Sequence, residues 1–249
     1  RILTSMIEKG IGPSDIPVYG TDGNMGSALS DQFDNPADIA GMKGTTPLTD
    51  LSSDFTDRLL EVNPDLVDFN YAAESYDAAV VIALAVIEAD TDGIEYAAKI
   101  NGITRGGEKC TEFKACADLL AAGTDIDYDG ASGPMEFSGN GEPTEASYGI
   151  LEFGADNKID DSKTVYQTAS ATAEADVPQE DPVGTRAGDG ERKIGTLLPE
   201  TGSLAFLGPP EFAGVDLAIA EINEGGGALG KDVLVSQGDA GDTETDTAN

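Results

Sequence analysis

The sequence predicts an α/β fold in which parallel strands are flanked by helices. Hydrophobic residues make up 39% of the 249 residues, so the chain can bury a core despite its strong charge. A strand at Lys193–Leu198, a helix at Pro210–Asn223 and a strand at Asp232–Ser236 follow one another near the end. A strand–helix–strand unit with a single crossover helix predicts two parallel strands joined by a right-handed connection.

The first part of the chain alternates short helices and strands. The spacing of Ile2, Leu3, Met6 and Ile7 places them on one helical face, and Gly10 ends that helix. No capping residue precedes Ile2, so we expect the helix to begin upstream. The elements expected next are a strand at Ile16–Tyr19, a polar helix at Ser27–Phe33, a strand at Ile39–Thr45 and a helix at Thr56–Val62.

The strongest helical signal covers Tyr71–Ala89. Tyr76, Val80, Leu84 and Ile87 recur at helical spacing, and alanines fill most of the remaining positions. A helix that is apolar on nearly every face is expected to be buried on most sides. Its longest apolar run is ten residues, which is too short to span a bilayer.

Two more helices and a hairpin are expected before the acidic part of the chain. The helices cover Gly93–Ile103 and Thr111–Ala122, and Gly123 is a suitable C-terminal cap for the second. The segments Gly133–Phe137 and Tyr148–Phe153 alternate apolar and polar residues, and the Ser-Gly-Asn-Gly turn between them predicts a hairpin.

Residues 168–192 are predicted to be a solvated linker. This stretch has no aromatic residue, six acids, several small residues, Pro178 and Pro182. It divides the chain into a first portion, residues 1–167, and a last portion, residues 193–249.

The charge balance excludes several classes of partner. The chain has 47 acidic and 14 basic residues and a net charge of −33. Nucleic acids and anionic membrane surfaces need clustered Lys and Arg, so neither is expected as a partner. The chain has no histidine, which excludes Ser-His-Asp catalysis and His-ligated zinc. We therefore expect a non-enzymatic protein without a cofactor or a metal.

The two cysteines, Cys110 and Cys116, favour a small-loop disulfide in an oxidising compartment. Their spacing differs from the CxxC redox pattern, and zinc would need two further ligands. Closing so short a loop should add ~2 kcal/mol of stability. The alternative is a pair of reduced cysteines in a cytosolic protein.

Two segments match ligand-binding motifs in letters but differ in context. Asp125–Glu136 fits the EF-hand calcium pattern, yet Ser132 stands where an apolar residue is usual, and Pro134 begins a strand-like exit. An acidic turn is favoured, with an EF-hand or an adventitious surface calcium site as alternatives. Gly225–Gly230 fits G-x-G-x-x-G, but a helix precedes it and a strand follows, opposite to a phosphate-binding loop. A helix stop and tight turn is favoured there.

Asp22 lies in the Thr21–Asn24 segment, which follows a predicted buried strand. Ligands of open α/β sheets sit beyond the carboxyl ends of strands, where an aspartate can meet a ligand ammonium group. The alternative is an Asx turn that caps the next helix.

Two portions of the chain resemble one known family. The segment that begins KIGTLLPETGSLAFLGPPEFAGVDLAIAEINEGGG resembles the opening of periplasmic binding proteins of the branched-chain amino-acid (Leu/Ile/Val) type. Residues 1–153 are similar to the last portion of the same family, through IPVYGTDG, IAGMKGTTP, YDAAVVIALAVIEA and SGPMEFSGNGEP. The resemblance covers nearly all of the chain except the linker.

The resemblance implies the two-lobed periplasmic-binding-protein type 1 fold and a role in ABC import. The implied partners are a small amino-acid-like ligand and the membrane subunits of the transporter. The implied location is extracellular or periplasmic, with a lipid anchor at the cell surface as one arrangement. Strong acidity suits a protein facing high ionic strength. By resemblance Asp22 would hold the ligand's ammonium, while Tyr71 and Leu207 would form walls; relatives often have an aromatic residue at the position of Leu207.

The order of the two portions is reversed relative to the family. The family's C-terminal portion comes first here, its N-terminal portion comes last, and its middle is missing. We therefore expect a permuted or incomplete protein, in which the loop that binds the ligand's carboxylate is absent. The alternative function is a structural subunit that exchanges segments with its neighbours to form a polymer or filament.

Overall fold

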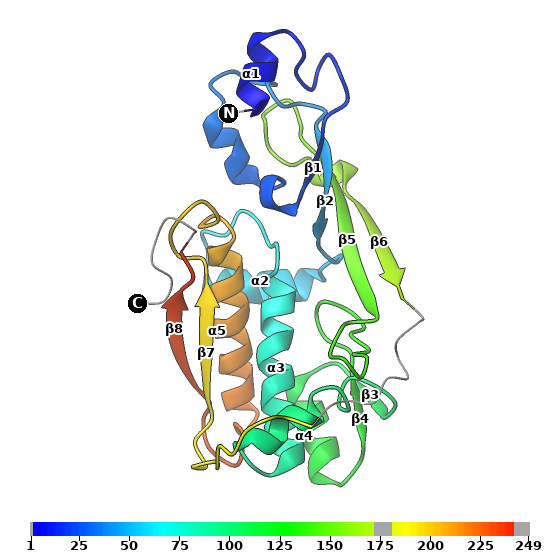
Figure 1. Cartoon of the computed structure of the whole chain (residues 1–249), viewed down its shortest axis with the longest axis vertical. Coiled ribbons are helices and arrows are strands. Elements are labelled where there is room, and N and C mark those ends of the chain that lie inside the picture. The colour runs from blue at the N-terminus through cyan, green and yellow to red at the C-terminus, as the bar shows by residue number, and fades with distance from the viewer. Residues whose placement is uncertain (1, 172–180, 242–249) are drawn as a thin grey trace.

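The structure, a computed structural model, describes residues 2–171 and 181–241 (Figure 1). Two separate hydrophobic cores divide these residues into a small lobe (residues 2–48 and 149–170) and a large lobe (residues 49–148 and 181–241). Within the described ranges, no helix combines the length and apolarity needed to cross a bilayer.

The small lobe is built around a four-stranded sheet of order β1-β2-β5-β6, in which β1 and β2 are parallel and the other pairs antiparallel. Its core contains Met25, Ile39, Met42, Leu151 and Phe153. The elements are α1 (Ile2–Glu8), β1 (Tyr19–Thr21), the 3-10 helices η1 (Asp22–Asn24), η2 (Ser27–Gln32) and η4 (Asp161–Lys163), β2 (Lys43–Pro47), β5 (Glu145–Glu152) and β6 (Val165–Ser170).

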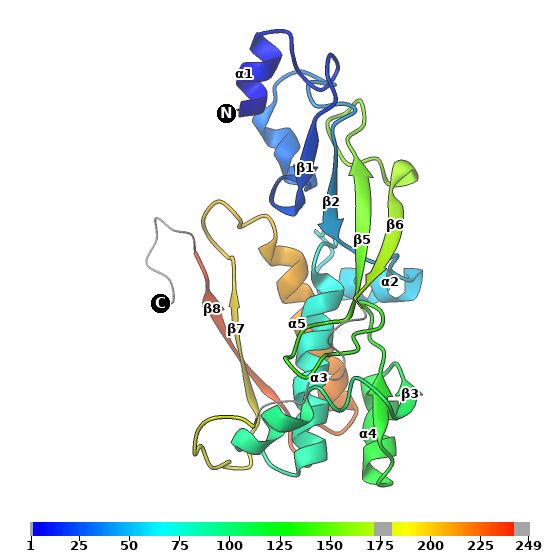
Figure 2. The same ribbon diagram turned by 45° about the vertical axis from the view of Figure 1, so that its right-hand side comes forward.

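The long strand β5 and its neighbour β2 carry the chain between the lobes (Figure 2). The register of the β2–β5 pair ends where Pro47 faces Tyr148. Beyond this point the backbone N–H of Leu48 still donates to the carbonyl of Ser147 at 3.2 Å. The two lobes are therefore joined by paired extended backbone at this crossing.

The large lobe places two long helices between two pairs of parallel strands (Figure 1). Strand β3 pairs with β4, and β7 pairs with β8, both in parallel. The elements are α2 (Ser53–Val62), α3 (Ala72–Ala89), η3 (Ile94–Lys99), β3 (Glu108–Cys110), α4 (Phe113–Ala121), β4 (Ile126–Tyr128), β7 (Lys193–Leu198), α5 (Gly208–Glu224) and β8 (Leu234–Asp239).

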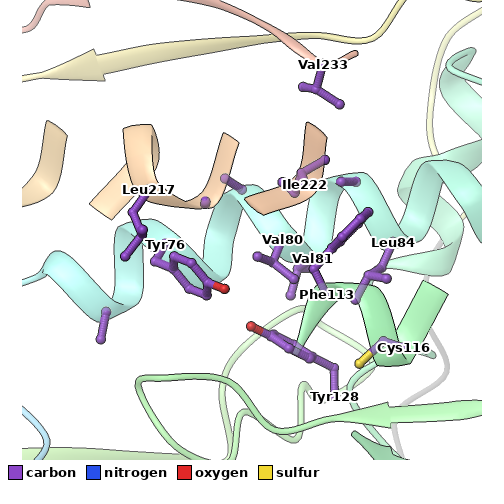
Figure 3. Close-up of a cluster of buried hydrophobic side chains, with 14 of the residues drawn as sticks. Tyr76, Val80, Val81, Leu84, Phe113, Cys116, Tyr128, Leu217, Ile222 and Val233 are labelled. Atoms are coloured by element: carbon purple, nitrogen blue, oxygen red, sulfur yellow. The ribbon is translucent and has the colours of Figure 1, made fainter. Parts of the chain in front are cut away.

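Helix α3 forms the centre of the large core (Figure 3). Val80 and Leu84 are fully buried, between Ile222 of α5 on one side and Tyr128 of β4 on the other. Helix α5 approaches α3 closely at Gly214, where an added Cβ would lie 2.1 Å from the carbonyl oxygen of Ala72. The first and last portions of the chain thus share one core.

Several predicted elements are confirmed. The helices Thr56–Val62, Tyr71–Ala89 and Thr111–Ala122 correspond to α2, α3 and α4, and the expected strand–helix–strand unit corresponds to β7, α5 and β8. The polar helix expected at Ser27–Phe33 and the helix expected at Gly93–Ile103 are 3-10 helices instead.

The predicted hairpin is wrong. Strand β5 pairs with β2 and β6, while Gly133–Phe137 forms only isolated bridges. Glu136 has a φ of 41°, which breaks an extended run, and the N–H of Phe137 donates to Thr104 Oγ1 at 3.3 Å. These local contacts replace the ladder that a hairpin would need.

The end of the predicted linker packs on the large lobe. Strand β6 extends to Ser170, and residues 172–180 lie outside the described ranges. The carboxylate of Asp92 accepts the N–H of Gly190 at 2.9 Å. The buried guanidinium of Arg192 lies over the Tyr96 ring, 4.4 Å from its centroid. The last residues before β7 are therefore held in place.

The two motif-like segments have ordinary structural partners. The ammonium of Lys109 lies 3.0 Å from carboxylate oxygens of Asp127 and Asp129 and 3.6 Å from Glu136, at three of the EF-hand side-chain positions. The Gly225–Gly230 segment follows α5 and leads to β8, and the N–H of Gly227 donates to the carbonyl of Ile222 at 2.8 Å. The latter is the helix stop that the sequence predicts.

The structure joins Cys110 and Cys116 in a disulfide, with Cα atoms 5.5 Å apart, so this prediction is confirmed. Both cysteines are buried in the large core. We expect the double substitution Cys110→Ala, Cys116→Ala to lower the free energy of unfolding by about 2 kcal/mol, because the open loop has more freedom when unfolded. Urea unfolding measures this, and the wild-type protein under reducing conditions serves as the control. Equal stability of the oxidised and reduced proteins would contradict the prediction.

Candidate functional site

Asp22 stands at the end of β1, where the small lobe faces the large lobe. Its turn is closed by Asn24, whose Oδ1 accepts the N–H of Thr21 at 3.0 Å. Gly20 is needed beside it, because an added Cβ would lie 2.2 Å from that oxygen. Asn24 and Gly20 thus fix the shape of the turn that holds Asp22 at the edge facing the large lobe.

Tyr71 meets Asp22 from the large lobe. It directly precedes α3 in the left-handed conformation, with φ 64°. Its hydroxyl donates to Asp22 Oδ2 at 2.7 Å. Burial and this bond raise the pKa of Tyr71, so the hydroxyl stays a donor. A strained backbone at a residue that bridges two lobes is typical of functional sites.

Two further contacts join the lobes next to this pair. The N–H of Ser27 donates to Asp68 Oδ2 at 3.0 Å. The ring of Phe206 lies so close to Gly26 that an added Cβ would be 3.0 Å from its Cε2. Leu207, 8% exposed, is buried at the start of α5, and it is the neighbouring Phe206 that reaches the small lobe.

Two carboxyl groups of the large lobe lie near Tyr71. Glu74 and Glu211 lie in the first turns of α3 and α5. Burial raises the pKa of Glu74, and burial together with the charge of Glu74 raises the pKa of Glu211 to about 7. Within the described residues, Glu211 Oε2 is buried without a hydrogen-bond partner. Both charges also help to raise the pKa of Tyr71.

Glu211 should make stability depend on pH. Its folded-state pKa of about 7 exceeds its ordinary value of 4.5, so the folded protein holds the proton more tightly and loses stability as pH rises from 4.5 to 7. We expect Glu211→Gln to be more stable than wild type at pH 8 by about 1 kcal/mol, a value reduced for solvent screening of this half-exposed group. Thermal unfolding across pH measures this, with the exposed Glu224→Gln as control. A loss of stability at pH 8 would contradict it.

The sequence pattern did not single out Glu74, Phe206, Asp68 or Glu211. Acids in the first turn of a helix are commonplace, because they complement the helix dipole. Only the packing of α3 beside α5 brings Glu74 and Glu211 together. A signal existed for Phe206, since the expected wall residue is its immediate neighbour.

Two α/β lobes with separate cores, joined by the Asp22–Tyr71 contact, are the arrangement of a two-lobed ligand-binding protein. The family described as "Receptor family ligand binding region" matches residues 19–156, and the family described as "Periplasmic binding protein" matches residues 191–249. The first match covers more than half of the chain, so the chain belongs to the receptor family ligand binding region family. The mixed α/β architecture agrees with a periplasmic binding protein type 1 fold.

Individual relatives match a short stretch of the chain. The Leu/Ile/Val-binding protein homolog 8 of Brucella abortus is 44% identical over 55 residues, which are 22% of this chain and 14% of that protein. Homolog 7 of the same organism is 37% identical over 59 residues, 24% of this chain and 15% of that protein. The chain spans about a seventh of the length of these curated relatives. No solved structure gives a significant match.

Proposed function

We propose that this chain belongs to the solute-binding protein of an ABC importer and contributes to binding a branched-chain amino acid or a similar small zwitterion or amide. The single observation that carries the proposal is a hydrogen bond between the facing lobes. In it the Tyr71 hydroxyl donates to Asp22 Oδ2 at 2.7 Å. The names of the Leu/Ile/Val-binding relatives support the ligand class.

The chemistry of the pair suits an ammonium group. Removing a zwitterion from water is costly unless its ammonium meets an anion and its carboxylate meets hydrogen-bond donors. Asp22 supplies the anion, and the Tyr71 hydroxyl orients it. Leu207 would contribute apolar surface behind Phe206. In this proposal the carboxylate donors come from a segment outside this chain.

The proposed arrangement places residues 1–167 at the C-terminal side of the family and residues 193–249 at its N-terminal side, with residues 168–192 as the linker. The family matches at residues 19–156 and 191–249 support two separate portions. The shared core of α3 and α5 supports their assembly in one lobe. The whole receptor would then need a middle portion as well.

The proposed location is extracellular or periplasmic, with a lipid anchor at the cell surface as one arrangement. The proposed partners are the membrane subunits of the transporter. The periplasmic binding family match supports this location. The disulfide also supports it, because disulfides persist in oxidising compartments. Binding by this mechanism involves no covalent step, so no enzymatic role is proposed.

A second candidate function is a structural subunit of a segment-exchanged polymer. Within the described residues β7 pairs with β8 alone, and Leu197 and Leu234 are 58% and 50% exposed. Parallel strands are usually covered on both faces, so this pair can accept a strand from a neighbour. Light scattering distinguishes the two functions. A series of oligomers that persists on dilution supports the polymer, whereas a monomer supports the receptor.

Substitution of Asp22 tests the proposed binding role. We expect Asp22→Ala to weaken binding of L-leucine to the full-length protein by about 2–4 kcal/mol, because the ligand's buried ammonium loses its charged partner. Calorimetric titration measures this. Tyr71→Phe should have a smaller effect, and the exposed small-lobe variant Asp34→Ala should have none. Unchanged affinity in Asp22→Ala would refute the role.

A further inference from the structure

A cavity of about 460 Å³ lies beside α3 and is separate from the Asp22–Tyr71 pair. One wall is the face of α3 that carries Ala78, Val81 and Ile82, and the opposite wall includes Met135 and Phe137. The first residues of β5 complete it, at the crossing between the lobes. A hollow of this size with mostly apolar walls is typical of small-molecule sites.

Every charged side chain on the cavity wall is acidic. Glu74, Asp77 and Glu145 contribute to the lining, and no lysine or arginine does. An apolar cavity with this charge attracts a cation and repels an anion. A ligand with a carboxylate would meet three like charges and no basic partner.

Asp77 and Glu74 differ in the hydrogen-bonding capacity that their carboxylates have left for a ligand. The buried carboxylate of Asp77 accepts bonds from Tyr128 Oη at 2.8 Å, from the backbone N–H groups of Ala131 and Ser132 at 2.9 and 2.7 Å, and from Ser132 Oγ at 2.5 Å. It is therefore fully used by the fold.

Glu74, by contrast, takes part in none of the ion pairs formed by the described residues. Its partial burial also raises its pKa, which a bound cation would counteract. Glu145 is likewise outside these ion pairs, but Glu74 is the lining carboxylate whose burial leaves it most in need of a cationic partner.

We propose that the α3 cavity is a second ligand site, which binds small primary amines that have an apolar body and no carboxylate. The ammonium group pairs with Glu74, and the apolar body packs between Val81 and Phe137. A charge-assisted hydrogen bond in a partly desolvated site is stronger than a neutral one, so the amine is favoured over a neutral molecule of the same shape. The site differs in ligand class from the zwitterion site proposed at Asp22.

Three probes of nearly the same shape test this proposal. 2-Phenylethylamine carries the ammonium alone, 2-phenylethanol is its neutral counterpart, and L-phenylalanine adds a carboxylate. Calorimetry and ligand-observed NMR should show that the amine binds at least tenfold more tightly than the alcohol, with L-phenylalanine absent from this cavity. Equal affinity for the amine and the alcohol would overturn the proposal, as would no binding of the amine to folded protein.

Variants assign the binding to the cavity. Glu74→Gln should remove the preference for the amine, and the exposed wall substitution Ala78→Trp should block all probes by filling the space. Circular dichroism checks that both variants are folded. Asp22→Asn should leave amine binding unchanged, so failure of the Asp22 site and failure of this site give different results. Amine binding that Asp22→Asn abolishes and Ala78→Trp does not would overturn the proposal.

Discussion

Replacing Asp77 with alanine should lower the free energy of unfolding by about 3 kcal/mol, because the donors around a buried carboxylate lose their acceptor. Burial raises the pKa of Asp77, while its bonds from Ser132 and Tyr128 favour the charged form. An added Cβ at Gly130 would lie 2.1 Å from Asp77 Oδ1, so the loop has no room to adjust around the carboxylate.

Urea unfolding measures the effect of Asp77→Ala. The exposed Asp57→Ala in α2 is the matched control and should stay within about 0.5 kcal/mol of wild type. If Asp77→Ala were no less stable than that control, the carboxylate would not be the anchor of the loop at residues 128–132.

Gly214→Ala should cost about 2–3 kcal/mol, since one methyl group overpacks the contact between α5 and α3. In an open helix the same change would stabilise by roughly 1 kcal/mol through helix propensity, so the sign of the effect reports the close approach. The obstacle is the backbone carbonyl of Ala72, which cannot turn aside as a flexible side chain would.

The Gly214 result also tests whether the two portions of the chain share a core. Ala220→Leu, on the exposed face of the same helix, is the control and should be nearly neutral. A more stable Gly214→Ala protein would show that α5 does not press against α3. Thermal unfolding of the two variants side by side provides the comparison.

The sequence predicts elements well where the signal is local and repeated. The apolar spacing of Tyr76, Val80 and Leu84 predicts α3, and the unit at residues 193–239 follows from strand and helix signals in direct succession. The pairing of β5 could not be predicted, because its partner β2 is about one hundred residues earlier in the chain. The Ser138–Gly141 turn is a genuine hairpin signal, but the N–H of Ser138 bonds within the turn to Glu142 and no ladder follows.

The candidate site shows the same difference between residues with a local sequence signal and residues placed by tertiary packing. Asp22 is detectable because it follows a strand, and Tyr71 because the family resemblance marks its position; the structure brings their side chains into contact. The role of Glu74 could not be read from sequence, since it depends on which face of α3 opens onto the cavity. Burial of an individual acid is a tertiary property, and helical spacing gives only the face on which the residue lies.

The proline at the end of β2 has a mechanical consequence for the whole molecule. Pro47 lacks a backbone N–H, so bending the paired strands β2 and β5 at this point breaks no hydrogen bond donated by that residue. We therefore expect the lobes to pivot about the Pro47–Tyr148 position while each retains its own interior. Amide exchange should therefore be slow in both interiors even while small-angle scattering records a change in the radius of gyration between the free and the occupied protein.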